Sequence, residues 1–397
     1  MRSPLDTRRH ARLAALAVAS ALVLVSAGCS AEPTPADSDS TTSPTHTLDA
    51  ATIEQFQKAL DDTRAAGGFP GVITTVISPQ GTWIGTSGVA AAGTDRIPTP
   101  TDRTRVGSLT KTMTATIVLQ LVEEGEVSLD DTIEEYVPGM PNGDIATLRQ
   151  LTDMSSGIPS YTGDPQWQQQ AFADPEKHWT PEELVGFVKD APADFAPGQG
   201  WAYSNTNYVL LGMVIEQVTG QPITDVFAQR IFEPLGMTDT SFPTDTNALP
   251  DPHLDGVTGQ GQPDGQTADA TNFSPSIAYT AGEVISTLED LQKWGDALFT
   301  GEGILNSDTQ QLRRESVIRD IPPAYSDTVG YGLGIGVHGD WWGHDGAIPG
   351  YTTSLSYSDA LDTTIIVITN SDVPFDIAGA TATPAPAVLA ALTALLD

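Results

Sequence analysis

A serine and a lysine at positions 108 and 111 are the residues of this 397-residue chain best placed to do chemistry together. Residues three apart share one face of a helix, so Ser108 and Lys111 would meet if a helix begins near Ser108. Apolar residues at helical spacing continue to Val122, and Gly125 suits the end of such a helix. A lysine whose pKa is lowered by burial can take the proton of a serine at the positive end of the helix dipole. The spacing therefore predicts a nucleophile with its base, as acyl transfer requires.

Two further short runs carry groups that could assist this pair. Tyr203 and Asn205 precede an apolar segment with helical spacing, and His344 and Gly346 end a short strand-like run. A tyrosine beside an ammonium group could shift toward phenolate and take the serine proton. An asparagine could hold a substrate amide, and a histidine could relay a proton or hold a carboxylate. Each run alone also fits an ordinary core or turn position, so the prediction depends on all three runs together.

In this order, Ser-x-x-Lys, Tyr-x-Asn and His-x-Gly resemble the motifs of the serine β-lactamase and penicillin-recognising DD-peptidase superfamily. The resemblance is to the branch of class C β-lactamases and D-alanyl-D-alanine carboxypeptidases. It covers roughly residues 48–370 and includes several runs beyond the three motifs. The runs that resemble this branch are 106–111, 119–125, 203–208, 234–237, 281–286 and 331–334.

The resemblance implies a role for each residue of the first two motifs. Ser108 would be the nucleophile that forms the acyl-enzyme, and Lys111 would be its activating partner. Tyr203 would shuttle a proton to the leaving group, and Asn205 would contact the amide of the substrate. In this mechanism Ser108 attacks an amide, ester or lactam carbonyl, and water then hydrolyses the acyl-enzyme.

The third motif would form one wall of the site. The resemblance places His344 and Gly346 on the edge strand of a sheet. It also implies an oxyanion hole made by the backbone N–H groups of Ser108 and Ala347. It implies no cofactor and no metal, and the histidines of the chain show no ligand spacing. A cation at His344 is a hypothesis for what lowers the pKa of Lys111 beyond burial.

Three positions depart from the pattern of the resembled branch. Asp345 stands at the centre of the third motif, where a threonine or serine hydroxyl could bind a substrate carboxylate. The run 334–338, which matches the preceding strand, carries no arginine for a terminal carboxylate. Met154 replaces a histidine in the run 151–157. These departures weaken the expectation that a free D-alanine carboxylate is recognised, and they favour another amide or ester substrate.

The predicted function is that of a serine acyl hydrolase of the D-alanyl-D-alanine carboxypeptidase type, which acts on peptidoglycan-type peptides and recognises β-lactams. A β-lactamase or an esterase of the same superfamily is an alternative, and so is a non-catalytic penicillin-recognising module. Binding alone does not require Lys111 beside Ser108, which argues against the module. The α/β-hydrolases need a Gly-x-Ser-x-Gly run, and the chain has none.

The N-terminal residues predict export. Arginines precede an apolar run at 13–25, which is too short to span a membrane, and small residues follow it. We therefore predict a signal peptide at 1–28. Cys29, the only cysteine, would carry a lipid that anchors the protein to the cell membrane on its extracytoplasmic side. Ordinary secretion with a free Cys29 is the alternative, and residues 29–47 would form a tether rich in Ser, Thr and Pro.

The balance of charged residues is strongly acidic, with 51 Asp and Glu against 18 Lys and Arg and a net charge of −33. This balance disfavours nucleic acid as a partner. It leaves a small peptide, β-lactam or ester as the expected ligand, because the charge does not identify a substrate.

Strand-like runs near both ends of the chain flank a mainly helical middle. With the resemblance, they predict an α/β (α+β) fold of the β-lactamase/transpeptidase type, in which helices flank an antiparallel sheet. Residues 48–125 and 280–397 would form the sheet domain, and residues 126–279 an inserted helical domain. A capping-box spacing predicts a helix that begins at Ser286. The expected strands are 71–77, 82–89, 329–337, 341–344, 351–357 and 363–369.

Overall fold

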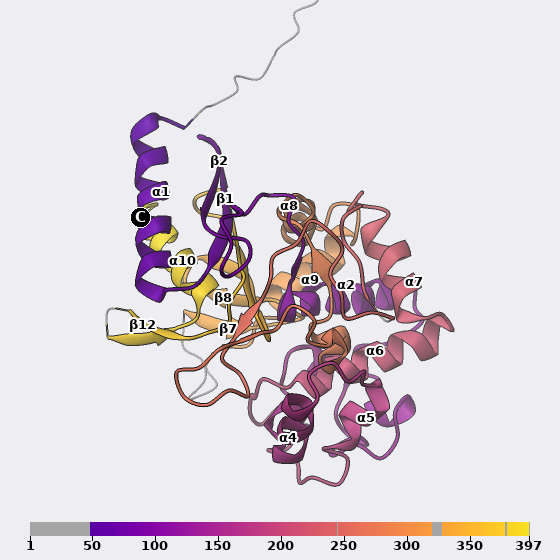
Figure 1. The fold of residues 1–397 in the computed structure, drawn as a ribbon. Helices are drawn as coiled ribbons and strands as arrows, with labels where there is room; N and C mark the ends of the chain where they lie inside the picture. The colour runs from indigo at the N-terminus through magenta and orange to yellow at the C-terminus, as the bar shows by residue number, and fades with distance from the viewer. Residues whose placement is uncertain (1–47, 244, 320–327, 378, 397) are drawn as a thin grey trace, which may run out of the picture. The chain divides into compact units, whose positions relative to one another are not determined.

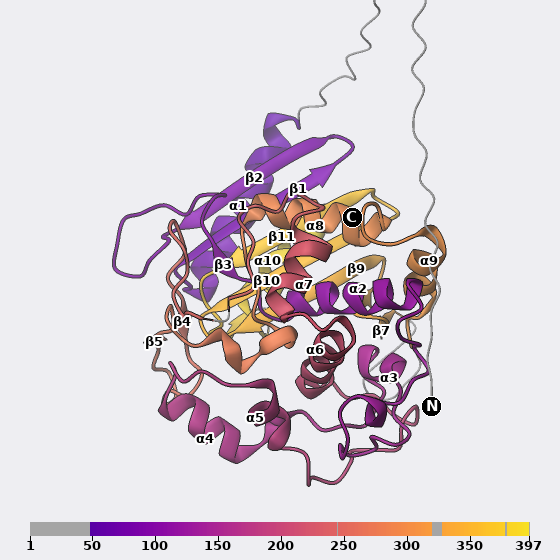
Figure 2. The same cartoon turned by 90° about the vertical axis from the view of Figure 1, so that its right-hand side faces the viewer.

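A computed structural model describes residues 48–243, 245–319, 328–377 and 379–396. These residues form a mixed α/β structure in which helices cover both faces of an antiparallel sheet (Figures 1 and 2). The predicted fold class is confirmed. No helix in these ranges is both long and apolar enough to cross a membrane. The predicted signal peptide, the tether and Cys29 lie outside the described residues and stay predictions.

The main sheet has seven strands in the order β2-β1-β11-β10-β9-β8-β7. It combines a hairpin near the start of the described chain with strands from its last third, because Ile73 of β1 pairs with Ile368 of β11. All neighbouring strands are antiparallel. The strands are β1 (Gly71–Ser78), β2 (Gly81–Gly88), β7 (Val329–Tyr331), β8 (Gly336–His338), β9 (Trp341–Ile348), β10 (Tyr351–Ser358) and β11 (Thr363–Thr369).

The strands near the third motif differ from the predicted ones. The run 329–337 was expected to form one strand, but it forms β7 and β8. Gly334, with a φ of 73°, adopts the left-handed conformation that turns the chain between them. The short strand expected at 341–344 extends to Ile348, because β10 pairs with β9 along its whole length. Three two-stranded sheets complete the structure: β3 (Thr104–Arg105) with β6 (Ile285–Ser286), β4 (Val257–Thr258) with β5 (Ala268–Asp269), and β12 (Phe375–Ile377) with β13 (Ala380–Ala382).

The helix boundaries follow local capping chemistry. Asp49 accepts hydrogen bonds from two backbone N–H groups at the start of α1, and Gly68 ends that helix in a left-handed conformation. The prediction that α8 begins at Ser286 is wrong: Ser286 lies in β6, and Thr287 caps the helix by accepting from the N–H of Asp290. The helices are α1 (Ala50–Gly67), α2 (Thr110–Glu123), α3 (Leu148–Thr152), α4 (Pro165–Ala173), α5 (Pro181–Gly186), α6 (Asn205–Thr219), α7 (Ile223–Phe227), α8 (Leu288–Thr300), α9 (Ser307–Glu315) and α10 (Pro384–Thr393).

The two faces of the sheet bury different apolar clusters. Helices α1 and α10 lie together on one face, where Phe56 and Val388 pack against Val72 and Val367 (Figure 1). The other face carries α8 and α2, and its larger cluster continues into α6 and the surrounding helices (Figure 2). Burial of each cluster removes apolar surface from water and holds the sheet between two layers. The boundaries predicted for the helical insertion, 126–279, stay a prediction.

Strand β9 packs unusually closely against the segment that leads into α2. Thr353 of β10 donates a hydrogen bond of 2.8 Å to the carbonyl of Val106. A Cβ on Gly346 would lie 1.9 Å from that carbonyl oxygen, and one on Gly107 would lie 2.7 Å from the N of Ala347. Only glycine therefore allows β9 and the turn before Ser108 to approach this closely.

We expect Gly346→Ala to separate β9 from the turn before Ser108 and to lower the free energy of unfolding by about 3 kcal/mol, because the added methyl overlaps the backbone. Urea unfolding would measure this loss, and acylation by a reactive ester should fall with it. Gly186→Ala in α5 is the matched control, since nothing lies within 4 Å of its added Cβ. Equal stability of the two variants would contradict the role given to Gly346.

Candidate active site

Ser108 and Lys111 meet at the junction of two short helical segments. A 3-10 turn, η1 (Gly107–Leu109), carries Ser108, and α2 begins at Thr110, so the α-helix starts two residues later than predicted. The amine Nζ of Lys111 lies 3.0 Å from Oγ of Ser108. Lys111 is fully buried, and this burial lowers the pKa of its amine well below the usual value. The predicted pair is therefore in hydrogen-bond contact.

Three oxygen atoms of other residues lie within hydrogen-bond distance of the Lys111 amine. Its Nζ donates hydrogen bonds of 2.7 Å to Oδ1 of Asn205 and to the carbonyl oxygen of Ala281. A neutral amine has two N–H donors and one lone pair. Nζ also lies 3.0 Å from Oγ of Ser108, and in a neutral amine whose two donors are taken in this way the lone pair would face that hydroxyl. The geometry thus prepares Lys111 to accept the proton of Ser108.

The orientation of Asn205 is fixed from two directions. As the first residue of α6, it donates its backbone N–H to Oγ of Ser160 at 3.1 Å. Its side-chain Nδ2 donates to Oγ1 of Thr162 at 3.3 Å, which leaves Oδ1 directed at Lys111. The predicted residue lies at the site, and the structure adds a contact with Lys111 that the substrate-amide role did not include.

Tyr203 lies over the same amine but remains a neutral phenol. The centroid of its ring is 4.9 Å from Nζ of Lys111, and 38% of the residue is exposed. The surrounding protein raises the pKa of its hydroxyl, and a hydrogen bond with Ser108 only partly opposes this shift. The expected shift toward phenolate is therefore wrong, because desolvation dominates the shift in the pKa of Tyr203. A neutral phenol at Tyr203 can donate a proton.

His344 is also neutral, which contradicts the hypothesis that its charge lowers the pKa of Lys111. Burial and the nearby Lys111 lower the pKa of His344 to about 3, against the opposing effect of a hydrogen bond to the Asp345 carbonyl. Its Nδ1 lies 2.5 Å from that carbonyl oxygen, so this nitrogen carries the hydrogen. Its Nε2 then accepts from the hydroxyl of Tyr331 at 2.8 Å. His344 orients its neighbours and supplies no cation.

The predicted oxyanion hole lies where β9 meets η1. Ala347 is exposed on β9, and its backbone N faces Gly107, which directly precedes Ser108. Beyond Gly343, strand β8 no longer pairs with β9, so the edge that carries Ala347 is uncovered by a strand. Two backbone N–H groups at this point could bind a developing oxyanion. The role of Ser108 and Ala347 in such a hole stays a prediction.

Sequence reasoning missed two groups that support the site. The carbonyl of Ala281 carries no side-chain signal, although its run resembled the family. Met154 has a φ of 68°, which is uncommon for a residue other than glycine. Its Sδ accepts from the N–H of Ser204 at 3.4 Å and from Nδ2 of Asn207 at 3.7 Å. Met154 thus holds the backbone of Ser204, the residue that follows Tyr203.

Ser108 and Tyr203 open into a cavity of about 1050 Å³. It runs along β9 and past the β8–β9 turn to α10. Its charged or titratable lining, among the described residues, consists of Tyr203, Tyr331, His338, Asp340, His344 and Asp345. No three His, Cys, Asp or Glu side chains in the described ranges gather as a metal site.

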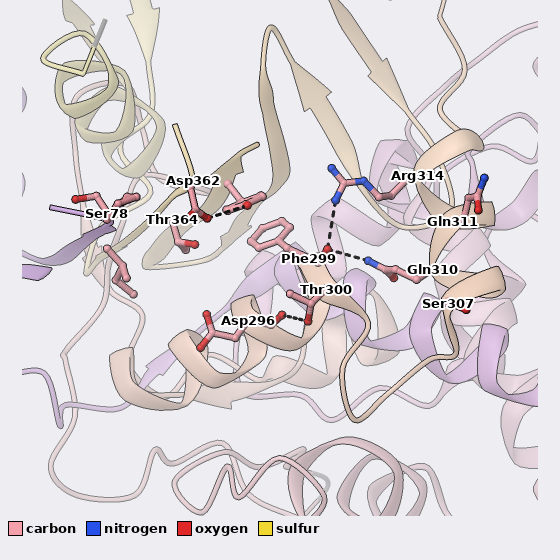
Figure 3. A pocket seen from close by; sticks show the side chains of 13 residues that line it. Ser78, Asp296, Phe299, Thr300, Ser307, Gln310, Gln311, Arg314, Asp362 and Thr364 are labelled. Atoms are coloured by element: carbon pink, nitrogen blue, oxygen red, sulfur yellow. Dashed lines mark hydrogen bonds between the residues drawn. The ribbon is translucent and has the colours of Figure 1, made fainter. Parts of the chain in front are cut away.

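A second cavity of about 710 Å³ lies between α8, α9 and the β10–β11 turn (Figure 3). Several of its polar groups already bond to backbone carbonyls. Gln310 and Arg314 donate to the carbonyl of Phe299 at 3.1 and 3.4 Å, and Thr300 donates to that of Asp296 at 2.6 Å. None of the motif residues lines this cavity, so the chemistry belongs to the cavity at Ser108.

We expect the free energy of unfolding to rise with pH because Lys111 is buried as a neutral amine. Between its lowered pKa in the folded chain and about 10.4 in the unfolded chain, only the unfolded chain binds the proton. The gain is up to about 1.4 kcal/mol per pH unit. Urea unfolding at pH 8 and 10 should show a larger gain for the wild type than for Lys111→Met. Parallel gains would mean that Lys111 is charged in the folded protein.

Replacement of His344 by glutamine should leave the acidic limb of the acylation pH profile in place. The reason is that His344 carries no charge above about pH 3, so its removal takes no cation from Lys111. The profile would be measured with a reactive ester from pH 5 to 9. A shift of the limb by more than about half a unit would show that His344 is charged in the working enzyme.

Two solved structures with related chains match this fold closely. A D-stereospecific amidohydrolase from Streptomyces sp. is 36% identical with a TM-score of 0.72, and the match covers 81% of this chain and 94% of that one. The D-amino acid amidase from Ochrobactrum anthropi SV3, complexed with L-phenylalanine amide, is 30% identical with a TM-score of 0.74. That match covers 87% of this chain and 98% of the amidase.

Curated relatives include Penicillin-binding protein 4* from Bacillus subtilis (strain 168), which is 26% identical over 305 residues. The match takes in 67% of this chain but only 60% of that protein, so this chain spans about three fifths of the length of the relative. The family model described as Beta-lactamase matches residues 52–386. With the site geometry, these findings show that the chain belongs to the Beta-lactamase family, within the serine hydrolase superfamily.

Proposed function

We propose that this protein hydrolyses amides of D-amino acids through an acyl-enzyme formed on Ser108. The observation that carries the proposal is the contact of 3.0 Å between Oγ of Ser108 and the amine of Lys111, which is fully buried and whose pKa is lowered by that burial. The likeness to two D-specific amide hydrolases supports this choice of bond and of stereochemistry.

The contacts support a sequence of proton transfers. Lys111 takes the hydroxyl proton as Oγ of Ser108 attacks the carbonyl carbon, and the backbone N–H groups of Ser108 and Ala347 bind the oxyanion. Tyr203, a neutral phenol beside Ser108, gives its proton to the leaving nitrogen as the C–N bond breaks. Lys111 then returns the first proton to the oxygen of Tyr203. Water attacks the acyl-enzyme, gives a proton to the same relay, and releases the acid with Ser108 restored.

The charges of the cavity support an amide without a free carboxylate. Among its described lining residues there is no Lys or Arg, whereas Asp340 and Asp345 both face it. A carboxylate bound there would lack a cationic partner and would meet like charges. D-alanyl-D-alanine carboxypeptidase activity is the second candidate, favoured by the match to a penicillin-binding relative.

We expect the purified protein to release ammonia from D-phenylalanine amide and far less from the L-amide. Ser108→Ala should lower kcat/KM by at least about 1000-fold, since it removes the nucleophile. Intact mass after mixing with a penicillin should show one adduct that is absent in the variant. Ser307→Ala, in the second cavity, is the control that should keep full activity.

Unchanged turnover in Ser108→Ala would contradict the proposal. Cleavage of peptides that end in D-Ala-D-Ala, with D-amides left intact, would select the carboxypeptidase candidate instead.

A further inference from the structure

Asp345 lies where the cavity crosses the edge of the sheet. It occupies β9 opposite Ser354 of β10, and the hydroxyl of Ser354 donates a 2.6 Å hydrogen bond to its Oδ1. This bond fixes the carboxylate and stabilises its charged form. Strand β8 pairs only with residues 341–343, so no strand covers β9 beside Asp345. The side chain is exposed and lines the same cavity as Ser108.

Successive side chains of β9 lie on opposite faces of the sheet. His344 lies on the face of Tyr203 and Tyr331, with which its ring makes contact. Side chains alternate along a strand, so Asp345 lies on the opposite face, which α10 covers. The cavity continues over the open edge between these faces, as its lining includes Ser108 and Leu389 of α10.

Among the described residues that line the cavity, none is Lys or Arg. Asp340 adds a second acid to this lining, and His338 is a neighbour that favours the ionised form of Asp345. Although the side chain is open to the cavity, desolvation by the surrounding protein raises the pKa of the Asp345 carboxyl, and the Ser354 bond opposes that shift. This edge of the sheet thus presents a fixed acid, with no Lys or Arg among the described lining residues, to the part of the substrate that reaches it.

In the proposed reaction, the leaving group is the part of the substrate that would extend toward Asp345. Tyr203 is the proton donor to the leaving nitrogen in the proposed reaction, and the charge of Asp345 acts on the Tyr203 hydroxyl. Ala347, at the predicted oxyanion hole, lies two residues further along β9, about 7 Å away. A substrate whose carbonyl oxygen sits at Ala347 and whose nitrogen faces Tyr203 would therefore extend its leaving group toward Asp345.

We propose that Asp345 selects the leaving group by charge, so that cationic amines are preferred to neutral ones and neutral amines to those with a carboxylate. This inference rests on the proposed amide hydrolysis and deepens it. The apolar residues Pro386 and Leu389 of α10 would contact the carbon chain of such an amine beyond the strand edge. The substrate class is then an amide of a D-amino acid with a diamine or with another amine that carries a positive group.

Three amides of D-phenylalanine test this selection: those of 1,2-diaminoethane, of propylamine and of glycine. Their leaving groups have similar length and carry positive, zero and negative charge. The wild type should hydrolyse the first at least about tenfold faster than the third, measured as kcat/KM. In Asp345→Asn, which keeps the size of the side chain, the ratio between these two substrates should fall to within about twofold. Asp296→Asn removes an equal charge at the second cavity and should keep the wild-type ratio.

The inference is overturned if the wild type treats the three amides alike or if Asp345→Asn keeps the wild-type order. If the proposed function is wrong, the result is different: no amide is hydrolysed in a manner that depends on Ser108. The selection by Asp345 would then be tested with the D-phenylalanine esters of aminoethanol, propanol and glycolic acid, whose leaving groups carry the same three charges. Loss of their order in Asp345→Asn would support the selection by Asp345 without amide hydrolysis, and retention of their order, or no turnover, would overturn it.

Discussion

Burial of one lysine amine sets the requirements that the rest of the site meets. Lys111 is fully buried, so the protein must supply acceptors for its N–H groups, and two of these come from α6 and from the segment that ends at Ala281. Thr280 binds the same parts together: its Oγ1 donates to the carbonyl of Tyr208, and its own carbonyl accepts from Thr114 of α2. The chemistry of Ser108 therefore depends on how three separate segments dock, and not on the Ser-x-x-Lys spacing alone.

A second requirement is the close approach of β9 to the turn before Ser108. Glycine at 107 and 346 permits it, and the bond from Thr353 to Val106 holds it. The short β8 leaves the edge of β9 open at this point, so backbone N–H groups remain available to a bound carbonyl. A longer β8 would cover this edge of β9. Because β8 is short, the cavity continues past the edge.

Much of the fold and the main pair could be predicted from local signals. The periodicity around α2 and the strand-like runs at 71–77, 351–357 and 363–369 identified these elements, and the three motifs named residues that the fold places near one another. Some ends of helices and strands depend on one glycine or one hydroxyl, such as the turn at Gly334 and the helix cap at Thr287. The sequence did not predict these ends, because several nearby residues have a similar propensity to end or begin an element. The predicted protonation states of Tyr203 and His344 were wrong because desolvation by the surrounding protein, the largest cause of both pKa shifts, arises only from tertiary packing.

The pairing of β1 with β11 has a consequence for the order of assembly. Gly71 donates its backbone N–H to the side chain of Asn370, 299 residues later. Strand β1 pairs with β11 on the side that faces the centre of the sheet. Contacts this distant along the chain close late and slowly, since the intervening loop must lose its freedom before they form. A growing chain that already contains Ser108 and Lys111 still lacks β9 and hence a wall for its substrate. The wall that β9 forms at the candidate site is therefore completed only after its neighbouring strands have been added to the chain.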